Sequence, residues 1–209
     1  DASGGGGDGT GGGQASGRSG SSVVASNAGG CGVVSGAASN VDGGTGDSVG
    51  PVVLLGGGIG VTPLRPFLAE LASGARGARE VVVLLSCQTH AQAVFADELI
   101  QTARASTAAA TAAETGARVT TVVTATRGGG PAGALPSVRS LTLATVVAAG
   151  GGLRAVGRLG HRELSALVPR LAEASVFMCG PPAFMEAMER ALVEAGADAR
   201  RVHHESFAY

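Results

Sequence analysis

The stretch VVLLGGGIGVTPLRPFL, residues 52–68, decides the fold. It begins with the apolar run 52–55, which is short enough to be a buried strand. Glycines fill most of positions 56–60, and Thr62 and Pro63 then open a helix, because proline is tolerated in the first helical turn. A strand, a glycine turn and a helix N-terminus together predict a phosphate site. The glycines let the backbone approach a diphosphate, and the free N–H groups and the helix dipole favour negative charge.

The glycine string differs from the two best-known phosphate motifs. A G-x-G-x-x-G fingerprint would need glycine where Val61 or Pro63 stands, and no Gly-Lys-Ser/Thr follows as in a P-loop. Taken alone, the pattern therefore leaves open a tight structural turn that binds no ligand.

Composition excludes several classes of function. The 209 residues suffice for one domain or a domain with an extension. The formal net charge of −1 provides no general attraction for nucleic acid or acidic membranes, and 3% aromatic residues provide few platforms for stacking bases. The uncharged run 140–153 is too short and too rich in glycine to span a bilayer. We therefore expect neither a nucleic-acid partner nor a membrane span.

Cysteine usage favours an intracellular reducing compartment, either the cytoplasm or an organelle. Cys31, Cys87 and Cys179 lack the close spacing of a disulfide framework or a metal site, so no metal is expected. The first residue is Asp rather than Met, so we expect a processed chain or an excerpt from a longer protein.

The chain divides into two parts. Residues 1–50 are rich in Gly and Ser and cannot bury enough apolar surface to offset the entropy of ordering, so we expect a disordered, flexible linker or insertion. Residues 51–209 alternate strand and helix patterns. Strands are expected at 52–55, 80–86, 118–124, 175–179 and 201–204. Helices are expected at about 63–72, 91–104, 161–171 and 182–195, and the third of them should be interrupted or end near Pro169. The stretch 127–152 is expected outside the core, although 141–147 has a strand-like composition.

This alternation predicts an α/β fold. We expect a Rossmann-like parallel sheet of five strands in the order 3-2-1-4-5, with helices on both faces. Ligands of such sheets bind at the carboxyl ends of the strands.

Three separated stretches resemble the NAD(P)-binding domain of the ferredoxin–NADP reductase family. GGGIGVTPLRPFL at 56–68 is similar to its Gly-Gly-x-Gly-x-Thr-Pro turn, VFMCGPPAFMEAMERALVEAG at 176–196 to its Cys-Gly-Pro-Pro segment, and HHESF at 203–207 to its terminal Glu-x-Phe. VFADEL at 94–99 and the pair Gly157–Arg158 are lesser matches. The resemblance covers most of residues 51–209 and none of 1–50.

The resemblance implies a role for each matching residue. The turn would hold the diphosphate of NADPH or NADH, Cys179 would lie beside the nicotinamide, and Glu205 and Phe207 would lie near a flavin. Catalysis would then be mainly positioning, with the cofactors supplying the chemistry. The other residues expected to contact the nucleotide are Gly57, Gly58, Gly60, Val61, Thr62, Pro63, Gly180, Pro181 and Pro182.

Two further residues bear on the choice between NADPH and NADH. Gln88 stands where many relatives carry Arg, and no Asp or Glu is present there to hold a ribose 2′-hydroxyl. Arg127 resembles the Arg of the Ser-Arg pair in NADP-preferring members, and arginine grips phosphate well. NADPH is favoured, and NADH stays open.

The flavin-binding half of the family is missing from this chain. That half carries an Arg-x-Tyr-Ser/Thr motif, whereas the only tyrosine here is Tyr209. FAD is therefore expected on a domain upstream or in a partner subunit. The resemblance implies the NAD(P)H-binding part of a flavin-dependent oxidoreductase, which passes electrons on to an acceptor protein or to a haem or iron–sulfur domain.

Two alternatives stay open. One is the reductase part of a flavohaemoglobin-like nitric oxide dioxygenase, and the other is a non-catalytic nucleotide-binding interaction module. A methyltransferase is disfavoured, because the acidic residues it needs near strand 52–55 and after strand 80–86 are absent.

Overall fold

The computed structural model describes residues 50–73, 80–113, 117–127 and 135–205, without the side chains of 111–113. The linker expected over residues 1–50 lies outside these ranges except for Gly50, and so does Phe207.

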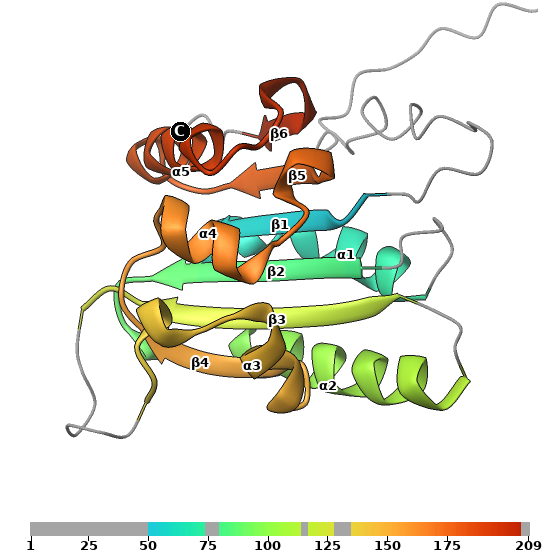
Figure 1. Cartoon of the computed structure of the whole chain (residues 1–209). Helices are drawn as coiled ribbons and strands as arrows, with labels where there is room; N and C mark the ends of the chain where they lie inside the picture. The colour runs from blue at the N-terminus through green and yellow to red at the C-terminus, as the bar shows by residue number, and fades with distance from the viewer. Residues whose placement is uncertain (1–49, 74–79, 114–116, 128–134, 206–209) are drawn as a thin grey trace, which may run out of the picture. The chain divides into compact units, whose positions relative to one another are not determined.

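The described residues form one parallel sheet in the order β4-β3-β2-β1-β5-β6 (Figure 1). The strands are β1 Val52–Gly57, β2 Glu80–Cys87, β3 Arg118–Ala125, β4 Gly152–Val156, β5 Ser175–Cys179 and β6 Val202–Glu205. The α-helices are α1 Leu64–Ala72, α2 Ala96–Ala113, α3 Leu143–Ala148, α4 His161–Leu167 and α5 Pro182–Glu194. Short 3₁₀ turns are η1 Gly58–Val61, η2 His90–Gln92, η3 Val138–Ser140, η4 Leu171–Glu173 and η5 Ala199–Arg201. The predicted parallel α/β fold is confirmed.

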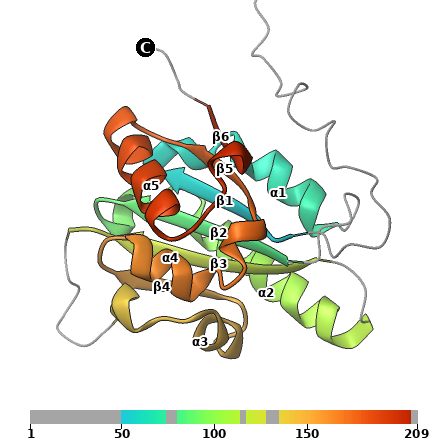
Figure 2. The same ribbon diagram turned by 45° about the horizontal axis from the view of Figure 1, so that its top comes forward.

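Helices cover both faces of the sheet, and each face has its own core (Figures 1 and 2). Successive residues of a strand point to opposite faces, so β1 contributes to both cores. Val52 and Leu54 pack with residues of α1 and α2, whereas Val53 and Leu55 pack with residues of α3, α4 and α5. The continuous apolar character of β1 and β2 follows from this burial on both faces.

The prediction of five strands was wrong, because a sixth strand, β4, extends the sheet beside β3. Its sequence, GLRAV, follows a run of glycines and carries Arg154, so it lacks the apolar pattern of the central strands. The glycines serve packing. A Cβ atom at Gly152 would lie 3.0 Å from the carbonyl oxygen of Ile100, so the close contact with α2 requires glycine there.

Other boundaries also differ from the prediction. The strand-like stretch 141–147 is mostly helix α3, whose first turn is capped by the paired side chains of Thr142 and Thr145. The helix over 161–171, which was expected to be interrupted or to end near Pro169, does end at Leu167, since a residue before proline, here Val168, disfavours the helical conformation. α2 begins at Ala96 rather than 91, after the short turn η2.

The sheet has a topological switch point between β1 and β5. From β1 the chain continues to β2, β3 and β4 on one side, and then returns to β5 and β6 on the other. In open α/β sheets this is where ligands bind, beyond the carboxyl ends of the strands.

Candidate functional site

The turns that follow β1 and β5 are in direct backbone contact at the switch point. Gly56 pairs with Cys179 in the register of the two strands. A Cβ atom at Gly60 would lie 2.2 Å from the carbonyl oxygen of Cys179, and one at Gly180 would lie 3.0 Å from Cα of Gly57. Glycine at these positions therefore allows two motifs that are far apart in the sequence to form one surface.

The first turn is held by its own hydrogen bonds. Gly58 has a φ of +57°, which favours glycine. Both the backbone N–H and the hydroxyl of Thr62 donate to the carbonyl oxygen of Ile59, at 2.9 and 2.8 Å. The side chain of Val61 is buried in the core, and Pro63 directly precedes α1.

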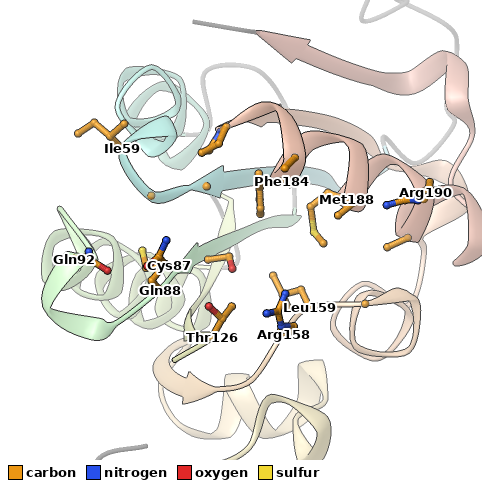
Figure 3. A pocket seen from close by; sticks show the side chains of 18 of the residues that line it. Ile59, Cys87, Gln88, Gln92, Thr126, Arg158, Leu159, Phe184, Met188 and Arg190 are labelled. Carbon is orange, nitrogen blue, oxygen red and sulfur yellow. The ribbon is translucent and has the colours of Figure 1, made fainter. Parts of the chain in front are cut away.

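A cavity of about 930 Å³ opens from this turn (Figure 3). It is bounded by the ends of β1 and β2, the residue after β3, the segment 158–160 with the first residue of α4, and one side of α5. Its size suits a cofactor-sized ligand. Of the residues predicted to bind a nucleotide, four line it: Gly57, Gly58, Gln88 and Pro181.

The structure brings Gln88 and Arg127 together beside the cavity. The backbone N–H of Arg127 donates to the carbonyl oxygen of Gln88 at 2.7 Å, and Nη1 of Arg127 donates to Oε1 of Gln88 at 3.4 Å. Arg127 is exposed, and among the two only Gln88 lines the cavity.

Cys179 and Glu205 are also brought together, as register partners on β5 and β6. Cys179 is fully buried. Burial raises the pKa of its thiol and the carboxylate of Glu205 raises it further, while a hydrogen bond from the backbone of Gly180 partly opposes them. The thiol is therefore protonated at neutral pH. Phe207, the third residue of this predicted group, lies outside the described residues.

No family model matches the sequence. No curated protein matches it either. Solved structures do match. The chain is similar to a flavohaemoglobin from Malassezia yamatoensis, solved with bound FAD and haem, at 30% identity and a TM-score of 0.51 over 76% of this chain. The resemblance to the NAD(P)-binding domain of the ferredoxin–NADP reductase family is confirmed.

Two more distant reductases share the fold of this reductase-like domain. One is the FAD/NAD-binding domain of nitric oxide dioxygenase from Vibrio cholerae, at 22% identity and a TM-score of 0.53 over 77% of this chain. The other is the cytochrome b5 reductase domain of Ulva prolifera nitrate reductase, at 18% identity and a TM-score of 0.53 over 76%. The chain spans 32% of the flavohaemoglobin and about half of the other two, at 52% and 49%.

Several residues of the reductase-like site were missed from the sequence. Phe184 packs against the core and also lines the cavity, where its ring fills the space in which a Cβ at Gly57 or Gly180 would lie. Arg158 appeared only as half of a weak motif, and Arg190 gave no signal. The helical spacing of Phe184, Met188 and Ala191 on α5 was a usable signal, because all three line the same wall.

Two searches of the described residues found nothing. Within the described ranges, no helix combines the length and the apolar character needed to cross a membrane. Among the same residues, no cluster of three or more His, Cys, Asp or Glu side chains is arranged to hold a metal ion.

Proposed function

We propose that this chain is the NAD(P)H-binding half of a flavin-dependent oxidoreductase. It holds NADPH or NADH while hydride passes to FAD on an adjoining domain, located upstream or in a partner subunit. Electrons then continue to an acceptor protein or to a haem or iron–sulfur domain. In this proposal residues 51–209 are the nucleotide-binding domain and residues 1–50 are its junction to the flavin domain. The observation that supports this proposal most directly is the backbone contact between Gly60 and Cys179 beside a cofactor-sized cavity.

The residues present fit a dinucleotide. Gly57 and Gly58 expose backbone to the cavity next to the N-terminus of α1, which suits a diphosphate. Ser86, Gln88 and Thr126 add polar groups along the ends of β2 and β3. These groups suit the hydroxyls of a ribose, and Arg127 beside Gln88 suits a 2′-phosphate.

The residues of this chain contribute positioning rather than acid–base chemistry. The cofactors supply the hydride donor and acceptor. Cys179, held neutral by burial, and the backbone of Gly180 present a close-fitting, uncharged surface for the nicotinamide ring. Pro181 caps α5 and Pro182 begins it, and together they fix the chain just beyond that surface. Glu205, in register with Cys179, would lie toward the flavin.

The second candidate is the reductase part of a flavohaemoglobin-like nitric oxide dioxygenase. The 30% identity with the flavohaemoglobin from Malassezia yamatoensis favours this more specific assignment. A haem Soret band in the native full-length protein, together with nitric oxide consumption driven by NAD(P)H, would establish it. A flavin spectrum without a haem band would rule out the flavohaemoglobin-like assignment and leave the general proposal of a flavin-dependent reductase.

The test is anaerobic mixing of the native full-length protein with NADPH and then NADH, followed by visible flavin absorbance. We expect the flavin to bleach, with the faster donor identifying the cofactor. Protein that carries flavin but is bleached by neither donor would contradict the proposal and favour the non-catalytic interaction module. If the protein purifies without flavin, the same measurement is made after adding its FAD-bearing partner. The exposed Arg162, outside the cavity, provides a control variant, Arg162→Ala.

A further inference from the structure

Two arginines that the proposed function leaves unused line the cavity. Arg158 follows β4, and Arg190 lies on α5. Both lie away from Ile59 and Gln92, which are at the other end of the cavity (Figure 3). In the described part of the chain, neither side chain forms a hydrogen bond or an ion pair. Two other arginines of the described residues are paired with carboxylates: Arg65 pairs with Glu98 at 2.6 Å, and Arg154 pairs with Asp97 at 2.8 Å. The cavity therefore presents guanidinium groups that no protein carboxylate neutralises.

The backbone that carries Arg158 is fixed on both sides. The N–H of Gly157 donates to the carbonyl oxygen of Ala125 at 2.9 Å, and Leu159 is buried in the core. Gly157 has a φ of +125°, and a Cβ there would lie 2.7 Å from Cγ1 of Val138. Glycine is thus required for this turn, which places Arg158 at the cavity wall with little freedom left in the backbone. Such preorganisation lowers the entropic cost of binding.

The remaining charged groups of the cavity leave a positive balance around these arginines. The cavity also contains Glu194 and His161, and Nδ1 of His161 lies 3.3 Å from Oε2 of Glu194. The carboxylate of Glu194, the one carboxylate in the cavity lining, is therefore already in contact with the imidazole of His161. Cys87 also lines the cavity, and its pKa is raised chiefly by burial, so its thiol carries no charge at neutral pH.

Arg127, the arginine favoured from the sequence, is placed differently. All three arginines are exposed, but Arg127 is hydrogen-bonded to Gln88 and lies outside the cavity lining. Arg158 and Arg190 line the same cavity as the glycine turn. A planar guanidinium matches phosphate oxygens in two parallel hydrogen bonds, which makes an unpaired arginine in a cavity well suited to this ligand.

We propose that Arg158, assisted by Arg190, binds a phosphate group of the nucleotide inside the cavity. This inference rests on the proposed function. The phosphate is either the diphosphate common to NADPH and NADH or the 2′-phosphate present only in NADPH, and the two sources are distinguished by comparing the two cofactors.

The test is titration calorimetry on the 209-residue chain with NADPH, with NADH and with inorganic diphosphate. The variants are Arg158→Ala, Arg190→Ala and the charge-conserving Arg158→Lys, with Arg162→Ala as the matched control. Far-UV circular dichroism and thermal unfolding verify that each variant is folded. We expect Arg158→Ala to weaken binding about tenfold or more, as for loss of a charge-assisted hydrogen bond, Arg190→Ala to weaken it less, and Arg158→Lys to retain part of the affinity.

Every outcome decides the inference. Equal losses for both cofactors assign Arg158 to the diphosphate, and a loss confined to NADPH assigns it to the 2′-phosphate. Wild-type affinities in Arg158→Ala would overturn the inference and leave the proposed function intact. If the wild-type chain binds neither cofactor, the proposed function fails. Diphosphate binding that depends on Arg158 would then still support the anion site, and its absence would overturn it.

Discussion

Gly60 and Cys179 meet so closely that a Cβ atom on the glycine would lie 2.2 Å from the carbonyl oxygen of the cysteine. The turn after β1 and the turn after β5 thus share one contact surface, and the cavity opens from the first of these turns. A nucleotide bound there would be held by both turns at once, so the contact links the stability of the fold to the proposed activity.

Gly60→Ala should destabilise the protein and weaken nucleotide binding together. The methyl group would collide with backbone, which cannot move aside as a side chain does, so we expect a cost of about 3 kcal/mol in the free energy of unfolding. Gly196→Ala is the control. Gly196 follows α5 with a φ of +92° and open space around its Cβ position. Backbone strain alone should therefore lower the free energy of unfolding of this variant by about 1 kcal/mol. Urea unfolding and NADPH titration measure both effects. Equal stabilities of the two variants would contradict the close contact.

Gly57 and Phe184 should be energetically coupled. A Cβ at Gly57 would lie 2.6 Å from Cδ1 of Phe184, so Gly57→Ala pushes against the ring. Removing the ring by Phe184→Ala should relieve that clash. A double-mutant cycle of unfolding free energies should therefore show a coupling of about 1 kcal/mol or more. Purely additive costs would mean that the ring does not cover the glycine.

Thiol reactivity and alkaline stability should reveal the burial of Cys87 and Cys179. In a Cys31→Ser background we expect both thiols to react slowly with a maleimide at pH 7–8 and fully after unfolding, since both are buried free cysteines. Burial raises the pKa of each thiol in the folded state. The protonated thiols therefore stabilise the folded state fully at pH values below about 9, the pKa of a thiol in the unfolded chain. This stabilisation is lost as the pH rises through the higher pKa of the thiols in the folded state.

Cys179→Ala isolates the share of Cys179 in this pH dependence. The unfolding free energy of this variant should fall less steeply above about pH 9 than that of the wild type. Identical slopes, or fast labelling of Cys179 in the native protein, would contradict its burial.

Arg127→Ala tests the interpretation of Arg127 as a reader of the 2′-phosphate. Because the side chain lies outside the cavity lining and is already hydrogen-bonded to Gln88, we expect a modest loss, about threefold to tenfold in NADPH affinity, with NADH affinity unchanged. Arg139→Ala, at an exposed position in the turn η3, is the matched control. Equal affinities of Arg127→Ala and the wild type for NADPH would remove Arg127 from the site and leave Arg158 as the candidate.

The central strands and the two motifs were predictable from sequence because their signals are local. Burial on both faces makes the core of β1 and β2 continuously apolar, and glycine and proline mark the turns at 56–63 and 180–182. β4 was not predictable in this way. It lies at the edge of the sheet, it carries Arg154, and its first residue, Gly152, reflects a contact with Ile100 on α2 that is visible only in three dimensions.

The same limit explains which site residues were missed. Gly57, Gly58 and Pro181 belong to recognisable motifs, so their place at the cavity was predictable. Arg158 and Arg190 come from different elements and meet the cavity only through the packing of α4 and α5 against the sheet. No sequence spacing relates them.

The most direct test of the nucleotide site is a titration of the ¹⁵N-labelled chain with NADPH, followed by the amide resonances of Gly57, Gly58 and Gly180. We predict saturable shifts at all three, because these amides lie where the two turns meet. Unchanged resonances at these glycines, at nucleotide concentrations that saturate known reductases, would contradict the proposal that the two turns form a nucleotide-binding site.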